Sequence, residues 1–103
     1  MDLDKSLIQE LRELAGRAIP PSTLILHIGN RLGMRDTNFR LPAIAYFREA
    51  FGLSLHDATN IGASCIFPDG ARDDDELNEK LIPMIQQTKP LWGAQGSRSN
   101  RTT

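Results

Sequence analysis

The stretch FREAFGLSLHDATNIG, residues 47–62, decides the fold of this chain because it contains two short helical patterns joined at a glycine. Phe47 and Phe51 are four residues apart, a spacing that places both rings on one side of a helix. Gly52 follows directly and suits the left-handed backbone that commonly ends a helix. The stretch therefore predicts a helical hairpin that turns at Gly52.

The second helix of this hairpin has its own start signal. Ser54 is a favoured N-cap residue, and Asp57 follows three residues later, as in a capping box. The carboxylate of Asp57 also favours the positive end of the helix dipole. We expect a short helix of about two turns that closes near Gly62.

Two further helices are predicted before the hairpin. In residues 3–18, apolar side chains recur at spacings of three and four, as on a helix with one apolar face. Pro20 and Pro21 end this pattern, because proline donates no N–H and restricts the residue before it. A second helix starts near Pro21 or Ser22, and Gly33 is its expected left-handed C-terminal cap.

The first helix of the hairpin, LPAIAYFREAF at residues 41–51, is the most aromatic element of the chain, so we place it at the centre of the core. Its spacing puts Ile44 on the same side as Phe47 and Phe51, with Leu41 close to them.

A fifth helix is predicted after an irregular segment with a Pro-Asp-Gly turn at residues 68–70. Asp73 and Glu76 form a second capping-box pattern. Pro83 must either kink this helix or end it. The expected apolar face consists of Leu77, Leu81, Ile82 and Ile85.

These patterns together predict an all-α fold, a single-domain bundle of about five short helices over residues 1–92. The last residues, 93–103, have no apolar side chain beyond one alanine, and we expect a disordered tail there. A chain of 103 residues has room for one core. Trp92 is the last residue of the predicted bundle. It either packs on the fifth helix or forms part of a binding interface.

Composition indicates a cytoplasmic protein. Hydrophobic content of 40% with 24% charged residues is ordinary for a globular protein, and no apolar run approaches the roughly 20 residues that span a bilayer. The N-terminus is acidic and amphipathic, unlike a signal peptide. Cys65 is the single cysteine, which fits a reducing compartment, and we expect it to be a small buried hydrophobe. Residues 65–67 have the composition of a brief strand, but no convincing partner strand is evident.

No residue pattern indicates an enzyme, a cofactor or a metal site. Ser54, His56 and Asp57 are close in sequence but point in different directions at a helix start, so they do not form a catalytic triad. His27 is expected to be a satisfied, partly buried histidine. A calcium loop starting at Asp69 fails, because Asp74 stands where that loop requires glycine.

Acidic residues are concentrated in residues 64–82, which hold six carboxylates against two basic side chains. One interpretation is a well-capped helix with solvated charges, and the other is an acidic patch that docks against a basic partner protein. His56 and Asp57 form a possible second contact. The partner-binding candidates are Asp69, Asp73, Asp74, Asp75, Glu76, Glu79, His56 and Asp57.

Nucleic acid is not the expected partner. Residues 47–62 could form a helix-turn-helix, but its second helix contains no Arg or Lys to reach phosphate or guanine. Only Thr59 and Asn60 offer groups that contact bases.

The segment IAYFREAFGLSLHDA, residues 44–58, resembles the helical hairpin in the C-terminal domain of the bacterial ribosomal stalk protein. In that family an arginine-containing helix ends in Gly-Leu-Gly-Leu, the next opens with Lys-Glu-Ala-Lys, and the hairpin surface receives translation-factor GTPases. Here the junction is GLSL at residues 52–55. His56 and Thr59 replace both lysines and the family's flanking strands are not evident, so the resemblance implies the hairpin and one exposed side but not factor binding.

In size and local acidity the chain also resembles the small single-domain immunity proteins that bacteria encode beside polymorphic toxins. This resemblance implies a non-catalytic bacterial protein that neutralises a toxin by covering its active site or basic substrate groove. The alternative is a regulatory or adaptor protein that uses the hairpin of residues 47–62 to bind a translation-related partner or DNA.

Overall fold

The computed structural model describes residues 3–34, 38–67 and 70–92, and every regular element in them is helical. This confirms the predicted all-α fold. The predicted tail, residues 93–103, lies outside the described residues. The elements in chain order are α1 (Lys5–Gly16), α2 (Pro21–Leu32), α3 (Arg40–Phe51), α4 (Leu55–Ala58), the 3₁₀ helix η1 (Thr59–Ala63) and α5 (Asp74–Gln87).

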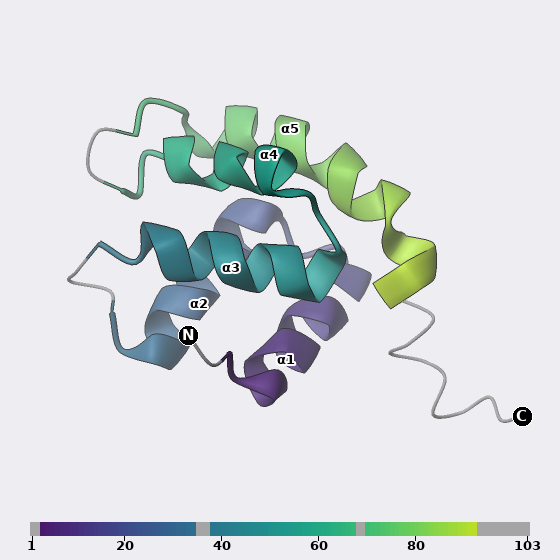
Figure 1. Ribbon diagram of the computed structural model, residues 1–103. Coiled ribbons are helices and arrows are strands. Elements are labelled where there is room, and N and C mark those ends of the chain that lie inside the picture. Colours follow the sequence, from purple (N-terminus) through teal and green to yellow (C-terminus); the bar gives the residue numbers. More distant parts are fainter. Residues whose placement is uncertain (1–2, 35–37, 68–69, 93–103) are drawn as a thin grey trace, which may run out of the picture.

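Helix α3 lies between the other elements (Figure 1). It contacts α1 and α2 on one side and α4 and η1 on the other, while α5 packs against η1 and α2. This arrangement places the most aromatic helix at the centre, as the sequence predicts. Phe47 and Phe51 of α3 are fully buried.

Trp92 belongs to the core. Its side chain is 3% exposed, and its ring packs edge-on against Phe51 with the ring centroids 5.1 Å apart. The indole N–H donates to the backbone carbonyl of Ile85 and the hydroxyl of Thr88, both at 3.2 Å. Of the two roles considered for this tryptophan, core packing is the one found.

The predicted helix ends are largely confirmed. Gly33 and Gly52 adopt left-handed backbone at φ 68° and 66°. The Ser54 hydroxyl accepts the N–H of Asp57 at 3.1 Å, and the helix that begins there continues as η1 past Gly62. Helix α1, however, ends at Gly16, before the apolar pattern does, because Ala18 takes a left-handed backbone with φ 64°.

Helix α5 continues through Pro83 to Gln87, so the option that proline ends this helix is wrong. Proline removes one hydrogen bond, the one that the carbonyl of Glu79 would accept. Both Glu79 and Pro83 are exposed, so the loss falls on the solvent side of the helix, where water can replace the missing donor.

The predictions that Leu41 and Ile82 lie on the apolar faces of their helices are wrong for related reasons. Leu41 is 72% exposed, because it shares its side of α3 with the exposed Arg48 seven residues later. Ile82 is 38% exposed, because it lies at the border of the apolar face of α5, between the buried Ile85 and the exposed Asp75 and Glu79.

Cys65 is exposed, which corrects the expectation of a buried thiol. The buried position goes to its neighbour Ser64, which is 1% exposed, and successive residues of an extended chain point to opposite sides. Residues 65–67 form no strand. A single parallel bridge pairs Ser64 with Arg72 instead, with the N–H of Cys65 donating to the carbonyl of Arg72 at 2.8 Å.

Replacing Ala18 with glycine is expected to stabilise the protein by about 0.5–1 kcal/mol, because a left-handed backbone strains any residue with a Cβ. The same change at Ala15, inside α1, should destabilise it by a similar amount. Urea denaturation of the two variants checks the pair. A loss of stability in Ala18→Gly would contradict the backbone described for this position.

Trp92→Ala should cost about 3 kcal/mol, because it empties a buried site and leaves the edge of Phe51 uncovered. The neighbouring Leu91 is 65% exposed, so Leu91→Ala serves as the control and should change stability by less than about 0.5 kcal/mol. Thermal unfolding measures both. Equal effects at the two positions would show that Trp92 is not part of the core.

Candidate protein-binding surface

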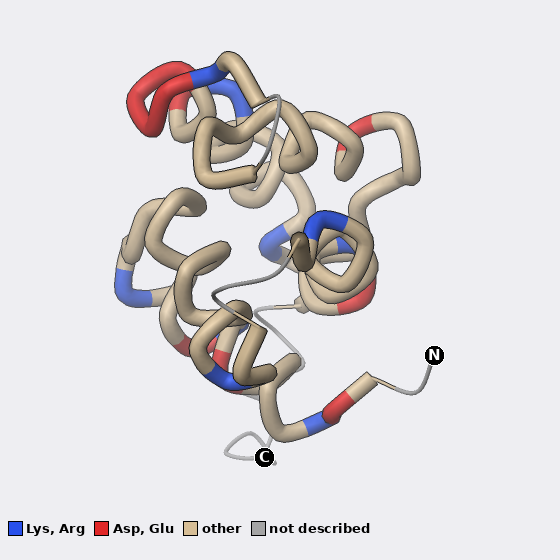
Figure 2. Tube along the Cα trace, turned by 90° about the vertical axis from the view of Figure 1, so that its left-hand side faces the viewer, with Lys and Arg blue, Asp and Glu red and all other residues tan. Residues whose placement is uncertain are grey.

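The start of α5 carries four consecutive exposed carboxylates, Asp73 to Glu76. Two of them form the predicted capping box. The Asp73 carboxylate accepts the N–H of Glu76 at 2.9 Å, and the Glu76 carboxylate accepts the N–H of Asp73 at 3.3 Å. Figure 2 shows this run as a red segment at one corner of the molecule.

The other two carboxylates, Asp74 and Asp75, are not needed for the cap. Within the described residues, the ion pairs all lie between α2 and the N-terminal part of the chain, and none includes Asp74 or Asp75. The dipole of α5 compensates part of their charge locally. This part of the surface therefore presents unpaired negative charge to solvent.

The remaining candidates extend or flank this group. Glu79 is exposed on α5, one turn beyond Asp75. Asp69 lies outside the described residues. We call the exposed carboxylates of α5 and its cap the acidic face, which consists of Asp73, Asp74, Asp75, Glu76 and Glu79.

His56 and Asp57 do not join the acidic face. They lie at the start of α4, whereas the end of η1 is the part tied to the start of α5, through the bridge between Ser64 and Arg72. The helical segment Leu55–Ala63, with four α-helical and five 3₁₀ residues, separates the two ends by about 16 Å. A typical interface of about 800 Å² per partner is wider than this, so one partner surface can contact both places.

Thr59 and Asn60, the residues that offered base contacts, bond to their own helix. The Thr59 hydroxyl donates to the carbonyl of His56 at 2.6 Å, and the Asn60 amide donates to the carbonyl of Asp57 at 2.9 Å. These bonds use the hydroxyl proton of Thr59 and one amide N–H of Asn60. They do not involve the second N–H or the carbonyl oxygen of the Asn60 side chain, so they do not test the DNA alternative.

A charged network that sequence reasoning missed joins α1 to α2. His27 Nε2 lies 2.8 Å from Glu10 Oε1, which satisfies this histidine as expected. Arg31 pairs with Glu10 and also donates to Asp4 Oδ2 at 3.2 Å. The residues are far apart in sequence, so only the antiparallel packing of the two helices reveals the network.

The network lowers the pKa of Glu10. The hydrogen bond with His27 is the largest cause, and Arg31 adds to it, while desolvation opposes both. The side chains of His27, Arg31 and Glu10 all remain about a third exposed, so the network adds only modestly to stability.

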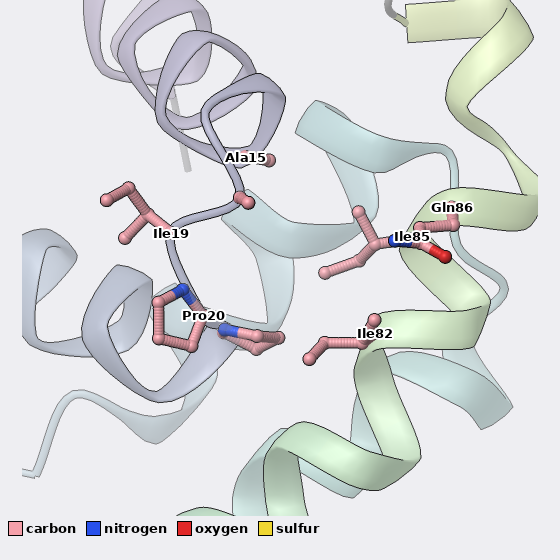
Figure 3. A pocket seen from close by; sticks show the side chains of 8 residues that line it. Ala15, Ile19, Pro20, Ile82, Ile85 and Gln86 are labelled. Carbon is pink, nitrogen blue, oxygen red and sulfur yellow. The ribbon is translucent and has the colours of Figure 1, made fainter.

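An apolar groove separates the α1–α2 connection from α5. It has a volume of about 120 Å³, and the side chains of Ile82 and Ile85 point across it toward the loop that carries Pro20 (Figure 3). Periodicity does not predict this groove, because it places Ile82 on the apolar face of the fifth helix. Its walls consist of Ala15, Ala18, Ile19, Pro20, Pro21, Ile82, Ile85 and Gln86.

Comparison with known proteins gives no relative: no family model, curated protein or solved structure matches this chain. Among residues 3–34, 38–67 and 70–92, no group of His, Cys, Asp or Glu side chains is arranged to hold a metal ion. In the same ranges, each helix is too short or too polar to cross a bilayer.

Glu10→Gln tests the network through its pH dependence. A carboxylate with a lowered pKa in the folded state stabilises the protein fully above its ordinary value of 4.5, and this contribution is lost as the pH falls through the lowered value. The variant should be less stable than the wild type at neutral pH, and the difference should shrink in acid. Urea midpoints at several pH values measure it.

Glu13→Gln, on the same helix and exposed, is the matched control and should leave the pH dependence unchanged. A gap between Glu10→Gln and wild type that stays constant down to strongly acidic pH would contradict the assignment.

Proposed function

We propose that this chain is a non-catalytic protein-binding module whose acidic face docks on a basic surface of another protein. The observation that carries the proposal is the surplus charge at the start of α5. A capping box needs only Asp73 and Glu76, yet Asp74 and Asp75 add two exposed carboxylates that no described basic side chain pairs.

Such a surface has a clear physical use. Complementary charge accelerates the encounter of two proteins and selects against partners of the same sign. The dipole of α5 places positive potential at this end of the helix, where negative side chains are favoured. The acidic face is therefore suited to setting the rate and the choice of association.

The finer proposal is that the partner is a basic toxin domain whose active site or substrate groove the acidic face covers, as immunity proteins do. Support for it comes from the small size of the chain and from the local acidity at one corner. We place this activity in the cytoplasm, where an exposed thiol such as Cys65 stays reduced.

A second candidate uses the hairpin of residues 47–62 as an adaptor surface for a translation-related protein or DNA. The observation in its favour is an exposed start of α4, where Leu55 is 56% exposed next to the exposed His56. A mobility-shift assay at low salt separates a nucleic-acid partner from a protein partner, because phosphate binding weakens steeply with salt.

Charge reversal tests the acidic face. Asp74→Lys with Asp75→Lys should lose a partner that the wild-type chain captures from its native cell. With that purified partner, the double variant should associate about tenfold more slowly at low salt, because the steering charge is reversed. Stopped-flow or surface plasmon resonance measurements at two salt concentrations give the rates.

The matched control is Glu13→Lys with Glu49→Lys, which makes the same change in net charge at exposed positions on α1 and α3. It should retain the wild-type association rate. If both double variants, or neither, slow association, the acidic face is not the docking surface.

A further inference from the structure

The acidic face and the apolar groove meet along one side of α5. Asp75, Glu79, Ile82 and Gln86 follow one another at spacings of four, three and four, which places them in one row on the helix. All four are exposed, and Ile82 and Gln86 also line the groove. The row thus runs from two carboxylates directly into an apolar hollow.

The opposite wall of the groove is fixed in place. The N–H of Ser22 donates to Asn78 Oδ1 at 2.8 Å, and the Asn78 amide donates to the Ser22 hydroxyl at 3.1 Å, which ties the start of α2 to α5. Ala18 holds a strained left-handed backbone in the same wall. The groove is therefore formed before any partner arrives.

Its size and surroundings indicate what fits. An apolar cavity of about 150 Å³ holds a benzene molecule, so a volume of about 120 Å³ admits one large side chain but not a helix. Along the helix axis, Glu79 lies about 4.5 Å and Asp75 about 10.5 Å from Ile82. Lys80 lies about 100° around α5 from Glu79 and about 140° from Asp75. None of the ion pairs of the described residues joins it to either carboxylate.

We infer that this row is a docking site for a segment of a basic protein that seats one apolar side chain in the groove and sets Lys or Arg on Asp75 and Glu79. The inference rests on the proposed function, since it assumes that the acidic face binds a protein, and it adds the apolar anchor that such a partner must carry. Burial of the anchor supplies affinity, while the carboxylates supply orientation.

Short alanine-based helical peptides test it. Each carries one leucine and, two helical turns away, a pair of lysines, with the lysines on the N-terminal side in one peptide and on the C-terminal side in the other. Titration of one of the two peptides into the wild-type protein should shift the backbone amide NMR signals of Ala18, Ile19 and Ile82. Replacing the leucine by glutamine should weaken binding about tenfold.

Variants of the protein supply the matched comparison. Ile82→Gln should also weaken binding about tenfold, whereas Leu91→Gln, at an exposed leucine elsewhere, should not. Asp75→Asn with Glu79→Gln should weaken binding mainly at low salt. Because the NMR mapping uses the wild-type chain, it stands even if a variant folds poorly.

Three outcomes overturn the inference: shifts that map elsewhere, equal binding of the leucine and glutamine peptides, or self-association of the protein that Ile82→Gln abolishes. The last would show that a second copy covers the groove. If any of these outcomes occurs while charge reversal at Asp74 and Asp75 still slows association with the native partner, the proposed apolar anchor is wrong. The acidic face then remains the docking surface. If that reversal also has no effect, both proposals fail.

Discussion

The contact of Phe51 with two other rings is the interaction on which the rest of the structure depends. Its ring packs edge-on against Phe47 at 5.4 Å and against Trp92 at 5.1 Å, so the centre of the chain is joined to its last described residue. Edge-on aromatic pairs stabilise a core beyond the area that they bury. This cluster fixes α3 at the middle of the molecule and holds Trp92, five residues beyond the end of α5, against it.

Polar contacts hold the other side of α3 in the same way. The hydroxyl of Tyr46 accepts the N–H of Asp4 at 2.7 Å, at the start of α1. Arg12 of α1 donates to the carbonyls of Ala50 and Glu49 at 2.8 and 3.2 Å, which satisfies acceptors at the end of α3 that the helix itself leaves open. Since the middle and the C-terminal end of α3 are both bound to the α1 region, the first two helices pack on one side of α3, while α4 and η1 pack on the other.

Local signals explain how much of this could be read from the sequence. Gly33, Gly52, Ser54 and the pair of Asp73 with Glu76 are helix-end signals that act over a few residues, and all appear in the structure as expected. The spacing of apolar side chains also predicts the helices themselves.

Three features could not be read this way. Whether Leu41 faces the core depends on where neighbouring helices pack, and periodicity alone leaves such a residue at the border of the apolar face. The network of Glu10, His27 and Arg31 depends on the packing of two helices. The groove at Ile82 depends on how a third helix, α5, packs beside the connection between α1 and α2. A short window of sequence therefore cannot predict it.

The charge on α5 has an energetic consequence that favours a partner. Asp75 and Glu79 are a like-charged pair four residues apart, an arrangement that destabilises a helix by about 0.2–0.5 kcal/mol, where an opposite charge at either position would stabilise it. Neither residue has an ion-pair partner within the described ranges. Capping explains Asp73 and Glu76 but not this pair. A basic segment laid along the row would turn the repulsion into two attractive contacts, and it would do so beside the apolar groove that Ile82 lines.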